Sequence, residues 1–223
     1  MKNYDLTIED GVITWIETGA SDNTPIPGIL YIPKEAAAFS ADALLALDEH
    51  IEGIVVHEDN PVFSSAHNCL LSKDGKKLIH ACKNSDISKL TGVEAIGRNA
   101  FSILGLHPEE FVLRIPDGVE VVEYRAFALS ADQVEITIPA SVVYVNLLAF
   151  MIHSQRTHII FEGDPQLRIG AFGTAAEAKD SGFEIFQNMP SILYPKPENI
   201  TVTCKPHSKV YEYCKTYGIP TEV

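Results

Sequence analysis

The stretch Val134-Glu135-Ile136-Thr137-Ile138-Pro139 decides the fold, because it alternates apolar and polar side chains and then stops at a proline. Successive side chains of a β-strand point to opposite faces, so the alternation predicts one buried and one exposed face. The same pattern occurs 23 residues earlier and 23 residues later, in residues 111–115 and 157–161. Each stretch is therefore expected to form one strand of a repeated unit.

A second landmark, the dipeptide Ala-Phe, recurs at residues 100–101, 126–127, 149–150 and 171–172. Its phenylalanines are 26, 23 and 22 residues apart. Ile96, Val122 and Val145 precede the first three by five residues, whereas the fourth copy, with Ile169, is two residues tighter. A unit with one short strand cannot bury both faces alone, so the strands are expected to stack in parallel, closed on the other side by the Ala-Phe segments.

These residues resemble the BspA-like leucine-rich-repeat family, whose units have the approximate form V-x-x-I-G-x-x-A-F followed by I-x-I-P-x-x-V. Residues 93–101 match the first motif, and residues 136–142 match the second. The stretches 59–65 and 70–79 resemble the hairpin insert of that family, with Asp74-Gly75 expected in a type I′ turn. The predicted fold class is α/β: a leucine-rich-repeat solenoid with one parallel strand per ~23-residue repeat, a β-hairpin insert and capping segments.

The expected organisation is a single leucine-rich-repeat domain over residues 1–223. Its predicted parts are an N-terminal cap (1–50), a strand with the hairpin insert (51–92), the repeats (93–172), and a degenerate repeat with a C-terminal cap (173–223). The cap is expected to contain two strands about Asp10-Gly11 and a helix over residues 36–47. Ser208 is expected to begin a C-terminal helix that has Val210, Cys214 and Tyr217 on one face and ends at Gly218.

The charge of the chain favours some partners over others. The net charge is −13, and residues 1–60 alone contribute twelve acidic and two basic side chains. Because an acidic surface repels phosphate groups, nucleic acid is not expected as a partner. No apolar run is long enough for a membrane-spanning helix, and the N-terminus lacks a signal sequence, so we expect either a cytoplasmic protein or a surface or secreted protein whose leader was removed.

No signature of catalysis or of a cofactor occurs in the sequence. We searched for nucleophile elbows, phosphate loops, zinc motifs and calcium loops, and found none. Cys69, Cys82, Cys204 and Cys214 lack metal spacing; Cys69 and Cys82 either face each other across the hairpin or are isolated core thiols. We therefore expect no enzyme, no metal and no cofactor.

The outward side chains of the predicted strands form a candidate binding stripe. If the alternate residues point into the core, the stripe consists of Val55, His57, Val112, Arg114, Glu135, Thr137, His158 and Ile160. The expected function is a protein-interaction scaffold; a structural module without its own ligand and a carbohydrate- or peptide-binding protein stay open as alternatives. The BspA-like resemblance implies association with surfaces, host proteins or other bacterial proteins, as in some relatives.

Overall fold

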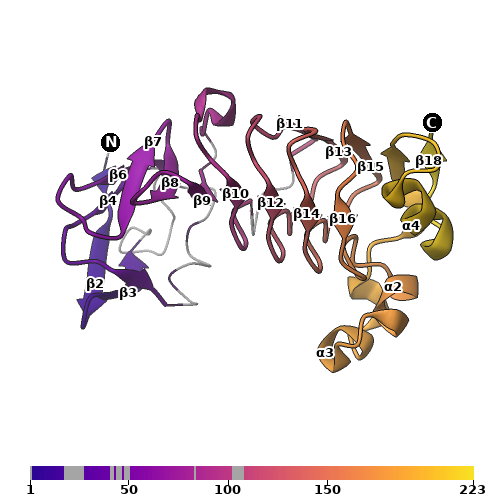
Figure 1. The fold of residues 1–223 in the computed structure, drawn as a ribbon. Coiled ribbons are helices and arrows are strands. Elements are labelled where there is room, and N and C mark those ends of the chain that lie inside the picture. Colours follow the sequence, from indigo (N-terminus) through magenta and orange to yellow (C-terminus); the bar gives the residue numbers. More distant parts are fainter. Residues whose placement is uncertain are drawn as a thin grey trace. The chain divides into compact units, whose positions relative to one another are not determined.

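The structure is a computed structural model that describes residues 2–17, 28–40, 43, 47, 51–82, 84–101 and 108–223. Part of the predicted N-terminal cap thus lies outside the described residues. The chain divides into two compact units, a finer division than one domain over residues 1–223. Within the described residues, the first unit ends at Val93 and the second begins at Glu94 (Figure 1).

The first unit is built from short strands that form parallel and antiparallel pairs. β4 lies between β1 and β6 in a parallel sheet, β2 and β3 form an antiparallel hairpin with β5 parallel to β3, and β7, β8 and β9 are antiparallel. A short 3-10 helix, η1 (Ile87–Lys89), follows. The strands are β1 (Lys2–Asn3), β2 (Asp5–Glu9), β3 (Val12–Glu17), β4 (Gly28–Ile32), β5 (Ala38–Phe39), β6 (Ile51–Val56), β7 (Phe63–Ala66), β8 (Cys69–Ser72) and β9 (Lys77–Ala81).

A buried asparagine ties the loops of this unit to its apolar core. Asn60 is 0% exposed, and its amide nitrogen donates to the carbonyl oxygens of Pro33 and Ala36, both at 2.7 Å. Its Oδ1 accepts from the backbone N–H groups of Val62 and Phe63. Because both ends of the amide are hydrogen-bonded, the side chain satisfies backbone groups that the loops would otherwise bury without partners.

Two turn predictions for this unit had different outcomes. The strands about Asp10-Gly11 are confirmed, and both residues have positive φ angles of 50° and 79°, as a type I′ turn requires. The type I′ turn at Asp74-Gly75 is wrong. The hairpin is present, but only Gly75 has a positive φ, and its N–H donates to the carbonyl of Ser72.

The predicted helix over residues 36–47 is wrong over residues 36–40, whereas Ala43 is helical. Ala38–Phe39 forms β5 instead, paired in parallel with Val12 and Ile13 of β3. Two backbone hydrogen bonds from residues 37 and 38 to the carbonyl of Gly11 hold this extended segment. Most of the rest of the predicted helix lies outside the described residues.

The second unit contains two parallel ladders of strands. One ladder has the order β10, β12, β14, β16, and the other has the order β11, β13, β15, β17, β18. The first consists of β10 (Ala95–Ile96), β12 (Val121–Val122), β14 (Tyr144–Val145) and β16 (Gln166–Leu167). The second consists of β11 (Glu110–Arg114), β13 (Gln133–Ile138), β15 (Arg156–Phe161), β17 (Ile200–Thr203) and β18 (Thr221–Glu222).

The register of both ladders follows the sequence spacing. Leu113 pairs with Ile136, and Ile136 pairs with Ile159, so the partners are 23 residues apart. In the other ladder, Val145 pairs with Leu167 of β16, which stands five residues before Phe172. The tighter fourth copy based on Ile169 is therefore wrong, because Leu167 is buried whereas Ile169 is 40% exposed.

Four phenylalanines form a row in the core of this unit. Phe127 is stacked on Phe101 at 4.8 Å and on Phe150 at 5.7 Å between ring centroids, and Phe150 contacts Phe172 at 5.5 Å. The backbone repeats this spacing, because the N–H of Phe127 donates to the carbonyl of Ala149 and that of Phe150 to the carbonyl of Ala171. Phe101, Phe127, Phe150 and Phe172 are each at most 3% exposed.

The end of the phenylalanine row is closed by two helices and a buried carboxyl group. Tyr213 contacts the ring of Phe172, and its hydroxyl is hydrogen-bonded to Glu177 and accepts from the N–H of Gly170. Glu177 is 0% exposed and forms a capping box with Thr174, and burial raises the pKa of its carboxyl group. The helices of this region are α2 (Ala175–Asp180), α3 (Glu184–Gln187), η2 (Ser191–Leu193), η3 (Pro197–Asn199) and α4 (Lys209–Tyr217).

The predicted C-terminal helix is confirmed as α4. The side chain of Ser208 accepts from the N–H of Tyr211 at the N-terminus, and Gly218 has the left-handed φ of 67° at the C-terminus. On the predicted face, Val210 and Cys214 are 0% exposed, whereas Tyr217 is only partly buried.

The predicted fold class, an α/β leucine-rich-repeat solenoid over the chain, is wrong. The described residues form several small sheets of mixed orientation, and the three α-helices with described bounds are short. One physical reason lies in the Ala-Phe turns. Asn99, Arg125, Leu148 and Gly170, each directly before an Ala-Phe, all have positive φ angles, and such residues interrupt an α-helix. The connections to the phenylalanines are thus turns and two-residue strands.

Candidate binding face

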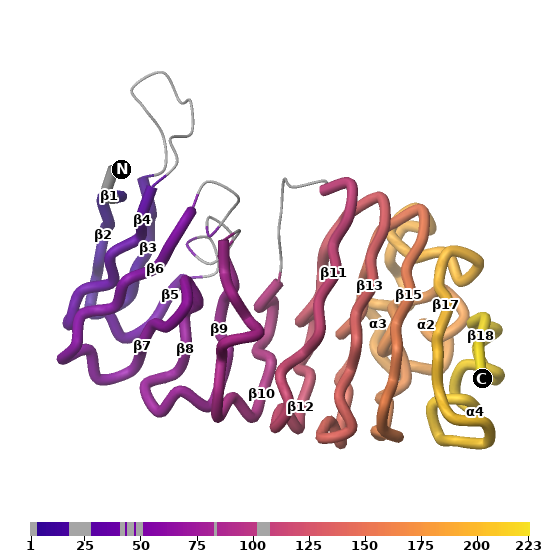
Figure 2. The backbone as a smooth tube through the Cα atoms, turned by 90° about the horizontal axis from the view of Figure 1, so that it is seen from above, coloured from indigo at the N-terminus to yellow at the C-terminus, as the bar shows by residue number. Residues whose placement is uncertain are grey.

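Outward side chains of four adjacent parallel strands form the candidate site. Figure 2 shows β11, β13, β15 and β17 side by side in this order. The residues between these side chains, such as Ile136 and Ile159, are 0% exposed, so the others point outward. The register places Val112, Glu135, His158 and Thr201 in one row, and Arg114, Thr137, Ile160 and Thr203 in the next. We call these eight residues the sheet face.

The sheet face contains six of the eight residues predicted for the stripe. Val55 and His57 belong to the first unit, where Val55 pairs with Tyr31 of β4 and is 46% exposed. The imidazole Nδ1 of His57 accepts from the N–H of Asp59 at 3.1 Å, so this ring stabilises its own turn. These two residues are not part of the ladder that carries the other six.

Sequence reasoning missed the contribution of β17. Thr201 and Thr203 continue the two rows of the sheet face beyond His158 and Ile160. The alternation of Ile200-Thr201-Val202-Thr203, with Ile200 and Val202 buried, contained the signal for both residues. The length of the connection from β15 concealed it, because this connection breaks the 23-residue spacing.

His158 lies between two carboxylates, that of Glu135 in the same row and that of Glu222 in β18. Its Nδ1 lies 3.4 Å from a carboxylate oxygen of Glu135, and its Nε2 lies 2.8 Å from the hydroxyl of Thr203 and 4.0 Å from a carboxylate oxygen of Glu222. The two carboxylates face opposite nitrogens of the ring, so they do not converge on one point as metal ligands would. A protonated imidazole would form ion pairs with both.

Thr203, His158 and Glu135 have the order of a nucleophile, a base and an orienting acid. Acyl transfer also needs hydrogen-bond donors for a developing oxyanion. β17 is paired with β15 on one side and with β18 on the other, so the sheet uses the backbone N–H groups around Thr203. The backbone N–H groups of β17 that pair with β15 and β18 are therefore not free to act as such donors.

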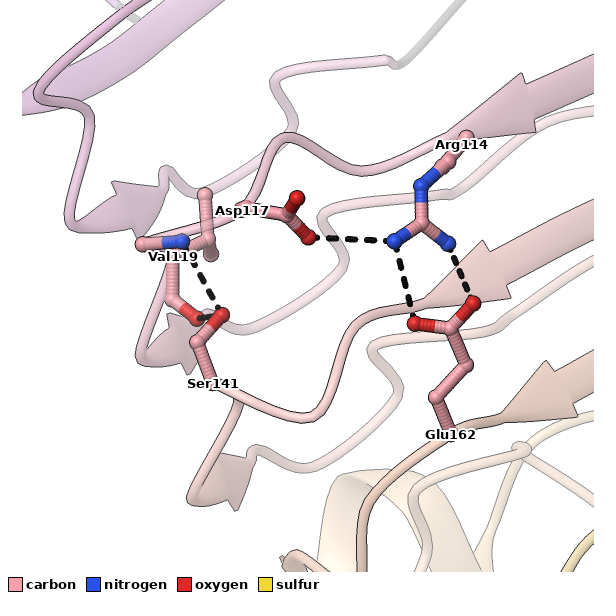
Figure 3. Close-up of polar contacts among 6 residues, drawn as sticks. Arg114, Asp117, Val119, Ser141 and Glu162 are labelled. Carbon is pink, nitrogen blue, oxygen red and sulfur yellow. Dashed lines mark hydrogen bonds and ion pairs between the residues drawn. The ribbon is translucent and has the colours of Figure 1, made fainter.

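Arg114 is held by two acidic side chains at the end of the second row. Its guanidinium donates to both carboxylate oxygens of Glu162, at 2.5 and 3.0 Å, and to Asp117 at 3.0 Å (Figure 3). The hydrogen bond to Glu162 raises the pKa of Arg114, and that to Arg114 lowers the pKa of Glu162. Close by, Ser141 accepts from the N–H of Gly118 and donates to the carbonyl of Val119 (Figure 3). The three hydrogen bonds to Glu162 and Asp117 leave the guanidinium of Arg114 with little capacity to bind a further anion.

The residues that could bind a metal or react as thiols are dispersed or buried. Among the described residues, no three His, Cys, Asp or Glu side chains are grouped as a metal site. All four cysteines are free and buried, and burial raises the pKa of Cys82 and Cys214 to about 12, so both thiols are protonated at neutral pH. None of the described helices has the length and hydropathy needed to cross a membrane.

The fold and the site thus define a mainly-β protein with an exposed, mixed polar and apolar sheet face. No protein-family model matches the chain, and no curated protein matches it. One solved structure that resembles it is the pneumococcal vaccine antigen PcpA, with 15% sequence identity and a TM-score of 0.40 over 87% of this chain. The chain spans about half the length of that protein, 55%. At this similarity the match defines neither family nor function, and membership of the BspA-like family stays a prediction.

Proposed function

We propose that this chain is a non-enzymatic binding protein whose sheet face holds an extended segment of a partner protein. One observation carries the proposal: two rows of outward side chains are aligned across four parallel strands. Strands in a sheet are about 4.8 Å apart, so such rows present side chains at fixed intervals. A partner would find these groups already positioned, which lowers the entropy lost on binding.

The side chains of the sheet face indicate the chemistry of the partner. Val112 is 60% exposed, and Ile160 is only partly covered, so both offer apolar contact. The Glu135 side chain is 48% exposed, and its nearest partner is His158 at 3.4 Å, so its carboxylate can accept further hydrogen bonds. We expect a partner segment with a basic side chain opposite Glu135 and apolar side chains opposite Val112 and Ile160.

Arg114 contributes less to the partner than its charge suggests. Both of its terminal nitrogens already donate to carboxylates of Glu162 and Asp117. Substitution of Arg114 would remove its ion pairs with Glu162 and Asp117 in addition to any contact with the partner. Glu135 is therefore the more informative position for a test.

Selection of binding peptides from a phage-displayed random library tests the proposal. Peptides enriched on the wild-type chain are measured against Glu135→Ala and against the triple variant Arg114→Ala, Glu135→Ala, His158→Ala. The control is Lys179→Ala, Glu184→Ala, which removes one charge of each sign at exposed positions of α2 and α3. We expect enriched basic-apolar peptides whose affinity falls about tenfold with Glu135→Ala, the loss typical of one charge-assisted hydrogen bond.

Two outcomes would contradict the proposal. Enriched peptides that bind the triple variant as tightly as the wild type would place the binding site elsewhere. The absence of any enriched peptide would favour the alternative of a structural module without its own ligand.

The resemblance to the BspA-like family, some of whose members associate with other proteins, supports the proposed protein-binding function.

A further inference from the structure

A cavity of the second unit lies apart from the sheet face. It is formed by the turn before β15 and by the segment that leads from η2 through η3 to β17. Its volume is about 230 Å³, which is below the range typical of drug-sized ligands and suits a small molecule or one side chain with its backbone group. It is lined by Ile152, His153, Ser154, Ile192, Tyr194, Pro195, Lys196, Asn199 and Ile200.

The walls of the cavity combine apolar and polar side chains and are partly fixed by hydrogen bonds. Ile152 and Ile200 are 3% and 2% exposed, whereas Ile192 is 85% exposed. Asn199 donates to the carbonyl oxygen of Ser154 at 2.7 Å, so the two sides of the cavity are joined directly. Because Ile192 exposes its side chain to water without an occupant, a ligand that covers it would gain hydrophobic free energy.

The polar part of the cavity contains one cationic side chain, that of Lys196. Lys196 is exposed, and among the described residues its ammonium group has no hydrogen-bonding or ion-pair partner. Burial lowers the pKa of the His153 imidazole, and the positive charge of Arg125 lowers it further. The Nε of Arg125 is itself buried without a hydrogen-bond partner within the described part of the chain. Arg125 does not line the cavity, so Lys196 is the one charged side chain among the described lining residues.

We propose that this cavity binds a carboxylate attached to a small branched apolar group, with Lys196 pairing the carboxylate and Ile192 covering the apolar group. His153 lines the same cavity and offers a ring nitrogen for a hydrogen bond to the bound molecule. Either a free organic acid or the carboxyl terminus of a polypeptide would supply this chemistry. The site is independent of the proposed function, because the cavity and the sheet face share no residue.

Titration of the full ¹⁵N-labelled chain, followed by amide chemical shifts, tests the proposal. The probes are 4-methylpentanoate for a free acid and N-acetyl-leucine for a chain terminus, each compared with its uncharged amide. We expect at least one acid to shift the amides of Ser154, Lys196 and Asn199, with a dissociation constant of about 1 mM, as for a ligand of this size. The amides are expected to bind at least about tenfold more weakly.

Two variants and a control separate binding at this site from non-specific binding. Lys196→Gln should weaken the acids about tenfold, down to the level of the amides, and Ile192→Ser should weaken all probes. Lys205→Gln, at another exposed lysine, should leave binding unchanged. Tighter binding of 4-methylpentanoate would identify free acids as the source, and tighter binding of N-acetyl-leucine would identify chain termini. Equal binding of acids and amides, an unaffected Lys196→Gln variant, or no shifts at about 10 mM of either acid would overturn the proposal.

Discussion

The phenylalanine row predicts a specific pattern of energetic coupling. Phe127 is 0% exposed and stacked between two rings, with interplanar angles of 11° to Phe101 and 14° to Phe150. Truncation by Phe127→Ala would leave a cavity between these rings and should lower the free energy of unfolding by about 3–5 kcal/mol. Val112→Ala, at a side chain that is 60% exposed, serves as the control and should change it by less than about 0.5 kcal/mol.

Leucine substitutions isolate the contribution of the ring contacts. Phe→Leu retains most of the apolar volume, so double-mutant cycles with leucine measure what neighbouring rings add to each other. We expect the pair Phe101 and Phe127 to couple by about 0.5–1.5 kcal/mol, the value typical of aromatic pairs in contact. Phe101 and Phe150 have no ring contact with each other among the described residues, so their substitutions should be additive within about 0.5 kcal/mol.

Amide hydrogen exchange measures these free energies within the second unit. The N–H groups of Phe101, Phe127 and Phe150 donate to carbonyls at 2.8–2.9 Å, so they exchange only when this region opens. Urea denaturation followed by far-UV circular dichroism provides an independent value. A cost below about 1 kcal/mol for Phe127→Ala, or equal coupling in both pairs, would refute the proposed stacking order.

Three further predictions concern buried groups and one glycine. Desolvation lowers the pKa of His80 from 6.5 to about 4. The contribution of the neutral imidazole to stability is therefore fully present above pH 6.5, and the free energy of unfolding should fall by about 3 kcal/mol as the pH drops from 6.5 through 4. His80→Leu should flatten this part of a plot of urea midpoint against pH, and an unchanged slope would exclude His80 as its cause. Tyr213→Phe removes the hydroxyl that is bonded to Glu177 and should cost about 1–3 kcal/mol in urea denaturation, against less than about 0.5 for Tyr211→Phe. Gly170 and Gly182 both have positive φ angles, but a Cβ at Gly170 would lie 2.5 Å from Cδ1 of Leu147, whereas at Gly182 it would meet nothing within 4 Å. Gly170→Ala should therefore lower the free energy of unfolding by about 1–3 kcal/mol more than Gly182→Ala does, and its thermal midpoint should be the lower of the two. Equal effects of the two substitutions would contradict the packing at Gly170.

Local patterns were enough to predict three strands of the second unit, β11, β13 and β15, and the two ends of α4. The alternation in residues 134–138 places Ile136 inward and Glu135 outward, because a strand has a side-chain period of two. Ser208 and Gly218 define the ends of α4 through hydrogen bonds and a backbone angle that depend on neighbouring residues only. Six residues of the predicted stripe lie on one face for the same reason.

Only the tertiary structure decided which strands are neighbours and which turns replace helices. Thr203 reaches His158 although the two are 45 residues apart, because β17 pairs with β15 after a long connection that no local pattern predicts. Three of the four residues with positive φ before an Ala-Phe, namely Asn99, Arg125 and Leu148, are not glycines, so the residue types did not reveal these turns. Pairing between distant strands and burial in the core determine which strands are neighbours and where the turns form. A short stretch of sequence cannot predict them, because it contains only the conformational preferences of its own residues.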